Sequence, residues 1–404
     1  MERRSIQTWL WAVLAAMFLM HAAVFWSLRD QVRDGYSDFS IFYTAGTILR
    51  RKAGGHLYDS GLQFRVQQEF APHVAIRQGA LPFNHPPFEA LWFAPLANLP
   101  YPRAFAAWAL LNLAILGALP FLLRRHVALL QRTPVVFWWL AELAFFAVFI
   151  ALLQGQDSVV LLLLFSLAYV ALKEKREFAA GCWLGLGLFR FHLVLPLLLI
   201  LLLHKKRNVI AGFLVTALSL VLISIAILGW QEAASYPSYV WNVENSSGSA
   251  ASLVSAMPNL RGFLHMIVPW TPRVAVVVSG LSALLLLWAS SKWSDSGEGF
   301  DLSFSLALVT TIVVSYHVLA HDLCLLLLPL VLLGNHFSRR NWPRGFARAA
   351  LLGPAIVLLC SPVQMLLWFR YGRFSILAPI LLLGAVGIAQ ELSRTAIGNH
   401  REPA

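Results

Sequence analysis

Charged residues are scarce in this chain. Asp, Glu, Lys and Arg make up 12% of its 404 residues, whereas apolar residues make up 59%. With a mean hydropathy of +0.69, this composition excludes an ordinary water-soluble globular protein. Apolar runs occupy most of the chain from Trp9 to Gln390, so no stretch is left that could form a separate water-soluble core. The sequence therefore predicts one integral membrane domain over residues 1–404.

Cysteine is also rare, and acidic residues are outnumbered by basic ones. Cys182, Cys324 and Cys360 fall within apolar runs and lack metal-ligand spacing, which indicates packing residues and no disulfide framework. The 31 Lys and Arg residues exceed the 19 Asp and Glu residues and give a formal net charge of +12. Because the basic residues lie in short clusters between apolar runs, they are topology signals, and nucleic acid is not an expected partner.

The basic clusters predict the orientation of the chain in a membrane. They are Arg3-Arg4, Arg124-Arg125, Lys173 to Arg176, Lys205 to Arg207 and Arg339-Arg340. The positive-inside rule places all of them on the cytoplasmic side. The first apolar run, about residues 9–28, then delivers a polar outer loop, residues 29–90, and a second outer loop is expected over residues 230–271. We expect an all-α integral membrane bundle of about twelve segments, with short interfacial helices in the outer loops.

Two intervals do not fit simple crossings of the membrane. Residues 178–204 are long enough for one crossing only, yet basic clusters flank both ends. A hairpin of two half-length helices, with its tip at Arg190-Phe191-His192, resolves this conflict. Such broken backbone survives in a membrane only when it is buried in protein or lines a wet cavity. The interval that runs from Lys292 to Arg340 through His321 is predicted to form a second hairpin of this kind.

Asp38 is the first candidate for chemistry. It lies just past the first apolar run, in a segment with aromatic residues at helical spacing. An acid in this place could take the proton from a hydroxyl nucleophile near the lipid headgroups. It could equally cap a helix that starts at Phe39, which is a common use of Asp. The residues alone leave both interpretations open.

Polar residues at the two predicted hairpin tips are the next candidates, because charge at membrane depth is costly to keep. Arg190 and His192 could bind a phosphate, or Arg190 could extend to the interface from an ordinary helix. His317 and His321 are predicted on one helical face, followed by Asp322. Their spacing could suit zinc, but no glutamate follows the first His and no third ligand is evident. A phosphate contact or a buried polar network is favoured, and no metal site is predicted.

Three loop motifs add weaker candidates. Asn84-His85-Pro86-Pro87-Phe88-Glu89 is a rigid turn that delivers His85 and Glu89 to the outer face, or simply a stop before a helix. The amides of Gln154-Gly155-Gln156-Asp157 could bind sugar hydroxyls or cap backbone groups. Within Pro258-Asn259-Leu260-Arg261-Gly262, Arg261 could hold an anion or pair with Asp38. The common placement of these motifs on one side of the membrane is a stronger signal than any one of them.

The motifs occur along the chain in an order that resembles that of a known protein family. The motifs are Ser37-Asp38-Phe39, Tyr43-x-Ala45-Gly46, Leu57-Tyr58-Asp59, Asn84-His85-Pro86-Pro87 with Pro95-Leu96 following, Gln154-Gly155-Gln156, the Gly-rich Arg190 hairpin, Asn259-Leu260-Arg261-Gly262, and His321-Asp322 near Pro329. Together they resemble glycosyltransferase family 87 over nearly the whole chain. The resemblance implies a GT-C type membrane enzyme, similar to the polyprenol-phosphate-mannose-dependent α-mannosyltransferases of bacterial envelope glycolipid synthesis.

The resemblance also implies roles for individual residues and partners. The family's catalytic Asp maps onto Asp38, and the donor would be a polyprenyl phosphate sugar that needs no metal or other cofactor. The expected donor-phosphate and substrate-binding residues are Arg190, His192, Arg261, His321, His85, Tyr43, Asn84, Gln156, Asn259, His317 and Asp322. The expected acceptor is an envelope glycolipid or glycan, and the expected location is a bacterial inner membrane with the site facing the periplasm or outer leaflet.

The chain departs from the family pattern at two motifs. His85-Pro86-Pro87 stands where family members often have Tyr-Pro-Pro, which leaves the identity of the donor sugar open. Arg190-Phe191 stands where they often have Lys-Pro, and Arg preserves phosphate binding. The main alternative function is a transporter or flippase of lipid-linked or anionic substrates, which would also place charges and broken helices at membrane depth. The sequence does not indicate an oligomeric state.

Overall fold

The structure is a computed structural model that describes residues 2–74, 81–245, 254–295 and 297–399. Within these ranges the chain is helical and contains no strand. The elements of the first half are α1 (Glu2–Arg33), α2 (Phe39–Arg50), η1 (Gly54–His56), α3 (Ser60–Phe70), η2 (Pro87–Glu89), α4 (Ala90–Phe93), η3 (Leu96–Asn98), α5 (Tyr101–Leu123), α6 (Ala128–Arg132), α7 (Val135–Ala144), α8 (Phe146–Gln154) and α9 (Ser158–Lys173).

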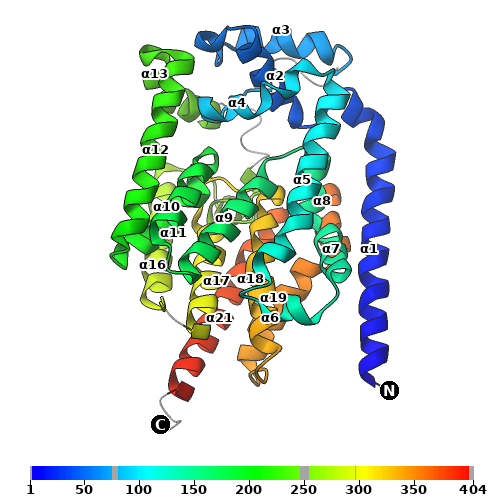
Figure 1. Ribbon diagram of the computed structural model, residues 1–404, viewed down its shortest axis with the longest axis vertical. Helices are drawn as coiled ribbons and strands as arrows, with labels where there is room; N and C mark the ends of the chain where they lie inside the picture. The colour runs from blue at the N-terminus through cyan, green and yellow to red at the C-terminus, as the bar shows by residue number, and fades with distance from the viewer. Residues whose placement is uncertain (1, 75–80, 246–253, 296, 400–404) are drawn as a thin grey trace.

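The second half continues the same architecture. Its elements are α10 (Glu177–Leu186), η4 (Gly187–Arg190), α11 (Phe191–Leu203), α12 (Arg207–Leu228), α13 (Trp230–Asn245), α15 (Leu260–Ile267), α16 (Pro272–Ser291), α17 (Gly297–Val314), η5 (Ala320–Leu326), α18 (Leu327–Phe337), α19 (Phe346–Leu359), α20 (Ser361–Met365), η6 (Leu366–Arg370), η7 (Phe374–Ile376) and α21 (Leu377–Asn399). Figure 1 shows an elongated bundle in which α1 begins and α21 ends at the same end.

By length and composition alone, seven described helical segments could cross a membrane, or up to nine if each of two bent pairs is one span. The seven include Glu177–Leu203 and Ala320–Phe337, which belong to the two hairpins described below. The bent pairs are α7 with α8, at 69°, and α19 with the segment Ser361–Arg370, at 68°. The polytopic helical bundle is therefore confirmed, but the predicted number of about twelve segments is not. The difference arises partly because the apolar helices α9 and α17 are too short to qualify.

The outer helices of the bundle carry apolar side chains on the surface. Leu214, Leu218 and Leu222 of α12 are 58%, 61% and 58% exposed. Residues four apart lie on one face of a helix, so these side chains form an apolar stripe. Such a stripe is unfavourable in water and suits contact with lipid.

Residues 177–203 fold back on themselves as predicted. By length and composition this interval could be a single span of 27 residues, which as a straight helix would be about 40 Å long. However, Lys206 Nζ lies 3.2 Å from Glu177 Oε1 and 2.8 Å from Asp295 Oδ1. Because Glu177 starts α10 and Lys206 follows α11, the two ends of the interval are adjacent. A straight helix could not make these contacts, so α10, η4 and α11 form a hairpin with Arg190 near its tip.

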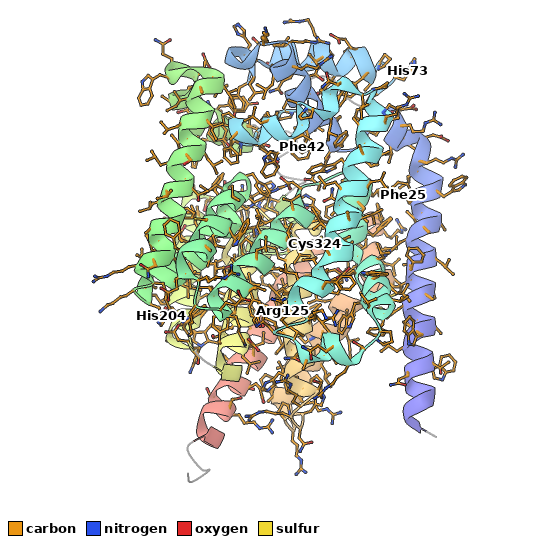
Figure 2. All side chains as sticks on the ribbon, in the orientation of Figure 1. Phe25, Phe42, His73, Arg125, His204 and Cys324 are labelled. Carbon is orange, nitrogen blue, oxygen red and sulfur yellow. The ribbon has the colours of Figure 1, made fainter. Side chains whose placement is uncertain are left out.

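The second hairpin comprises α17, η5 and α18. Its first helix is anchored by an ion pair between Lys173 and Asp301. Near its other end, Asn335 Oδ1 accepts a hydrogen bond of 3.0 Å from the backbone N–H of Leu129, close to the Arg124-Arg125 cluster. Both hairpins thus start and finish at the end of the bundle that carries the basic clusters, which we call the basic end. Arg125 and His204 lie toward it in Figure 2.

The opposite end of the bundle, which we call the loop end, is covered by α2, α3, α4 and α13 (Figure 1). The predicted first outer loop thus contains short helices. Its packing is tight: a Cβ on Gly46 would lie 2.5 Å from the Phe93 carbonyl oxygen. The hydroxyl of Tyr58 donates to the carbonyl oxygen of His85 at 2.8 Å. These contacts fix the loop segments that reach the interior of the bundle.

Candidate active site

The turn at residues 155–158, between α8 and α9, is the point on which the loop end and both hairpin tips converge. Gly155 ends α8 in the left-handed conformation, with φ 65° and ψ 38°. A Cβ at this position would lie 2.7 Å from Phe39 Cβ, and the Gly155 carbonyl oxygen accepts a hydrogen bond of 3.0 Å from Trp108 Nε1. Glycine is required here by both backbone conformation and space, because only glycine lets α2 approach the turn so closely.

A Gly155→Ala substitution tests this packing. It should destabilise the protein by about 2–3 kcal/mol, because it combines a left-handed residue with a clash against Phe39. The measurement is thermal unfolding of the purified protein in detergent. Gly117→Ala is the matched control, since a Cβ at Gly117 in α5 would meet nothing within 4 Å. If Gly155→Ala and Gly117→Ala unfold at the same temperature, glycine is not required at position 155.

Asp38 immediately precedes α2 and points its carboxylate at the turn. Its Oδ2 accepts a hydrogen bond of 2.7 Å from Gln156 Nε2, and its backbone N–H donates to Gln154 Oε1 at 3.1 Å. The side chain makes no capping hydrogen bond to α2, so the helix-cap interpretation does not describe this residue. Asp38 is half-buried, and within the described part of the chain no hydrogen bond occupies its Oδ1.

Arg190, at the tip of the first hairpin, fixes the orientation of Gln156. Its Nη2 donates to Gln156 Oε1 at 2.6 Å and to Asp157 Oδ1 at 2.7 Å, and its Nε donates to Asp157 Oδ1 at 2.9 Å. Because the amide oxygen of Gln156 accepts from Arg190, its nitrogen is left to donate to Asp38. Arg190 is only 5% exposed, which excludes the alternative in which it extends to the membrane surface.

The tip of the second hairpin reaches the same turn. Ser158 Oγ lies 2.8 Å from His321 Nδ1 and donates to Asp322 Oδ1 at 3.2 Å. Asp322 Oδ1 is also 3.9 Å from Arg190 Nη1, and Asp322 Oδ2 accepts from the backbone N–H of Leu319 at 2.8 Å. His321 is buried, and among the described residues its Nε2 has no hydrogen-bond partner.

The loop end contributes His85 and Glu89 to the other side of Asp157. His85 Nδ1 lies 2.7 Å from Glu89 Oε2 and 3.6 Å from Asp157 Oδ2. Burial lowers the pKa of His85 to about 3, with the charge of Arg190 acting in the same direction, so the imidazole is neutral at pH 7. Burial also raises the pKa of Glu89 well above its ordinary value, and the neighbouring Asp157 carboxylate adds to this effect. Within the described part of the chain, these three side chains form a group that could hold a metal ion.

A second group of predicted residues borders the hairpin tips. Asn259 caps α15 by accepting from the Gly262 backbone N–H at 2.8 Å, and its Nδ2 donates to the Ser315 carbonyl oxygen at 2.8 Å. Ser315 Oγ in turn donates to the carbonyl oxygen of His192 at 2.9 Å, and the His192 and His317 rings are 5.8 Å apart. His317 precedes η5 in a non-helical segment. The prediction that His317 and His321 share a helical face is therefore wrong.

Arg261 lies in the first turn of α15, against the same segment. Its guanidinium carbon is 3.9 Å from the centre of the Tyr316 ring and 5.4 Å from that of Trp270, and its Nη1 donates to the Tyr316 carbonyl oxygen at 3.4 Å. Arg261 is thus placed beside the second hairpin tip by aromatic rings. Asn259, Ser315 and His192 connect this segment to Arg190.

Tyr43 and Asn84 take part in the packing of the loop end. The hydroxyl of Tyr43 donates to the Leu99 carbonyl oxygen at 2.8 Å, and its ring packs against Phe70 with centroids 5.0 Å apart. The carbonyl oxygen of Asn84 accepts a hydrogen bond of 3.1 Å from the Tyr236 hydroxyl, which joins α13 to this segment. Both residues position the loop that carries His85.

Three residues at the centre of the site, Asp157, Ser158 and Glu89, were not among the residues predicted to bind substrate. Glu89 and Asp157 do lie in loop motifs that the sequence singled out, and each is a carboxylate beside a predicted site residue in a chain with few acids. Ser158 carried no such signal. That signal does not say which side chain faces the site.

Comparison with known proteins assigns the chain to a family. The family model described as glycosyltransferase family 87 matches residues 83–315, which is more than half of the chain. The matched range includes His85, the 155–158 turn and Arg190, whereas Asp38 and His321 lie outside it. No curated protein matches the chain significantly. Together with the polytopic helical bundle, the match shows that the chain belongs to glycosyltransferase family 87 and is a membrane glycosyltransferase.

Proposed function

We propose that the protein transfers a sugar, with mannose as the first candidate, from a polyprenyl phosphate sugar to a hydroxyl group of an envelope glycolipid or glycan. Asp38 is the proposed general base. The observation that carries this proposal is the hydrogen-bonded series Asp38–Gln156–Arg190, in which Asp38 Oδ2 is held at 2.7 Å and Gln156 Oε1 at 2.6 Å. This arrangement holds a carboxylate at the loop end in a fixed orientation and leaves its Oδ1 to accept a proton.

The proposed reaction is a single displacement with inversion of configuration. The acceptor hydroxyl gives its proton to Asp38 Oδ1 while its oxygen forms a bond to the anomeric carbon of the donor. The bond between the anomeric carbon and the phosphate oxygen breaks, and polyprenyl phosphate leaves with that electron pair. A β-linked donor then gives an α-linked product. The base must lie on the face of the sugar opposite the leaving phosphate, so the acceptor enters between the sugar and Asp38.

The charge that develops on the leaving phosphate is proposed to be stabilised by side chains alone, with no cofactor in the transfer step. Two buried nitrogens, His192 Nε2 and His321 Nε2, have no hydrogen-bond partner among the described residues. His192 Nε2 could donate to a phosphate oxygen from the neutral ring. Because Ser158 donates to Asp322, His321 Nδ1 must donate to Ser158, and His321 Nε2 could donate to phosphate only when both ring nitrogens carry a proton. Arg261 lies beside the same segment and adds positive charge. Arg190 is already held by Asp157, so its proposed role shifts from direct phosphate ligand to orienting Gln156 and supplying a fixed charge.

A lipid-linked donor is proposed because of how the chain is built. The described residues form a single helical bundle without a separate water-soluble domain that could bind a nucleotide sugar, and apolar faces such as that of α12 adjoin lipid. The loop end is proposed to face the outer leaflet or periplasm of a bacterial inner membrane, because the basic clusters favour a cytoplasmic location for the basic end. Donor and acceptor would then both enter from the outer leaflet.

The proposal is tested with purified protein in lipid nanodiscs and radiolabelled short-chain polyprenyl phosphate mannose. The expected result is transfer of label into an extracted membrane-lipid or glycan acceptor, with release of polyprenyl phosphate. Polyprenyl phosphate glucose and galactose, run in parallel, identify the sugar. If no donor yields product but the labelled donor moves across proteoliposome membranes, the transporter alternative is the correct one.

A further inference from the structure

His85, Glu89 and Asp157 converge on one point on the side of Asp157 that faces away from Arg190. Asp157 uses Oδ1 for Arg190 and presents Oδ2 to His85, 3.6 Å away. Glu89 Oε2 lies 2.7 Å from the same His85 nitrogen. One ligand atom from each residue lies within 4.8 Å of the others, so small side-chain movements would bring all three to a common ion.

Carboxyl groups outnumber the cations that pair with them around this point. Glu89, Asp157 and Asp322 have fully buried side chains, and the guanidinium of Arg190 pairs with Asp157 and Asp322 only. Glu89 Oε1 and Asp157 Oδ2 are buried, and in the described ranges no N–H or hydroxyl group donates to either, so these two carboxyls must share a proton or bind a cation. Buried carboxylate oxygens without partners are expensive. A cation at this point would satisfy these oxygens and could replace the proton that burial favours on Glu89.

We propose that His85, Glu89 and Asp157 bind one divalent transition-metal cation of the Mn²⁺ or Zn²⁺ type. An imidazole nitrogen with two carboxylate oxygens suits these ions, whereas Mg²⁺ and Ca²⁺ prefer oxygen ligands alone. Neighbouring groups that do not contact the ion also fix the positions of the three ligands. Arg190 fixes Asp157, the Tyr58 hydroxyl bonds to the His85 carbonyl oxygen at 2.8 Å, and Pro86 and Pro87 stiffen the segment that joins His85 to Glu89.

The ion would position residues and would take no part in sugar transfer. It would clamp residues 85–89 of the loop end onto the 155–158 turn and hold Asp157 toward Arg190, which in turn orients Gln156 and Asp38. The inference goes beyond the proposed function, because it concerns metal binding and does not depend on the donor. Sequence spacing predicted no metal site, since residues 85 and 157 are far apart in the chain.

The test is metal binding by the full-length protein, purified in detergent and stripped with EDTA. Titration with Mn²⁺, followed by the loss of its free electron paramagnetic resonance signal, should give one ion per chain, and Zn²⁺ should compete for it. Glu89→Gln should weaken Mn²⁺ binding by about 10–100-fold. Glu69→Gln is the matched control, because Glu69 is an exposed acid of the same loop that pairs with Arg51, and it should bind Mn²⁺ like the wild type.

Three outcomes would overturn the proposal. The wild type could bind neither Mn²⁺ nor Zn²⁺, in which case Glu89 and Asp157 share a proton in place of an ion. Glu89→Gln could bind as tightly as Glu69→Gln, which would place the ion elsewhere. If Glu89→Gln does not fold, the Mn²⁺ affinity of His85→Gln and the number of ions bound by the wild type are used in its place. A Mn²⁺ affinity of His85→Gln equal to that of the wild type would also refute the site. None of these readouts requires enzyme activity, so they separate this inference from the proposed transfer reaction.

Discussion

Replacing Asp38 with Asn is expected to lower the rate of sugar transfer by about 10²–10⁴-fold, the range that a positioned general base contributes. Asn has nearly the same shape as Asp, and its amide oxygen can still accept the hydrogen bond from Gln156 Nε2. The variant should therefore fold normally and lose only the ability to take a proton. The measurement is the initial rate of label transfer from polyprenyl phosphate mannose at equal folded yield, together with the melting temperature of each protein.

Asp59→Asn is the matched control for this experiment. Asp59 lies in the same loop-end segment and is a true helix cap, because its Oδ1 accepts from the Leu62 backbone N–H at 2.6 Å. Asn caps helices as well as Asp does, so Asp59→Asn should transfer sugar at the wild-type rate. If Asp38→Asn and Asp59→Asn are equally active, Asp38 is not the base. The proposed mechanism would then have to be abandoned even if the wild type is an active transferase.

Replacing Arg190 with Met is expected to have the largest effect on stability, with a loss of about 3–5 kcal/mol in the free energy of unfolding. Met fills much of the same volume but leaves the carboxylates of Asp157 and Asp322 buried without their shared cation. The measurement is thermal or denaturant unfolding in detergent. Transfer activity should also fall, because the amide of Gln156 loses the hydrogen bond that orients it toward Asp38.

Arg51→Met is the comparison for Arg190→Met. It measures how much an exposed ion pair contributes to the free energy of unfolding, relative to the buried ion pairs of Arg190. Arg51 and Glu69 form a bidentate pair, but their side chains are 41% and 52% exposed. Water and salt screen such a pair, so its loss should cost less than about 1 kcal/mol. Adding Asp157→Asn to Arg190→Met should recover part of the lost stability, because it removes one of the unpaired charges. Equal destabilisation by Arg190→Met and Arg51→Met would contradict the account of a buried charge network.

The sequence by itself determined the kind of protein and the outline of its topology. Apolar content and the spacing of basic clusters decide whether a segment lies in lipid and on which side its ends remain, and both can be read from neighbouring residues. That is why the return of residues 177–203 to the basic end could be predicted. The order of motifs was enough to indicate the family. The number of segments was predicted less well, because bent pairs and short helices depend on packing that hydropathy does not describe.

The tertiary structure alone decided which polar residues work together. Only the structure showed that the Asp38 carboxylate makes no helix-capping hydrogen bond and accepts instead from Gln156, more than a hundred residues away. Asp157 became central only because Arg190, His85 and the second hairpin tip approach it from different parts of the chain. Hydropathy and local spacing act within one segment, whereas the direction of a buried side chain is fixed by partners that are distant in sequence. The orientation of the guanidinium of Arg190 was therefore beyond sequence analysis.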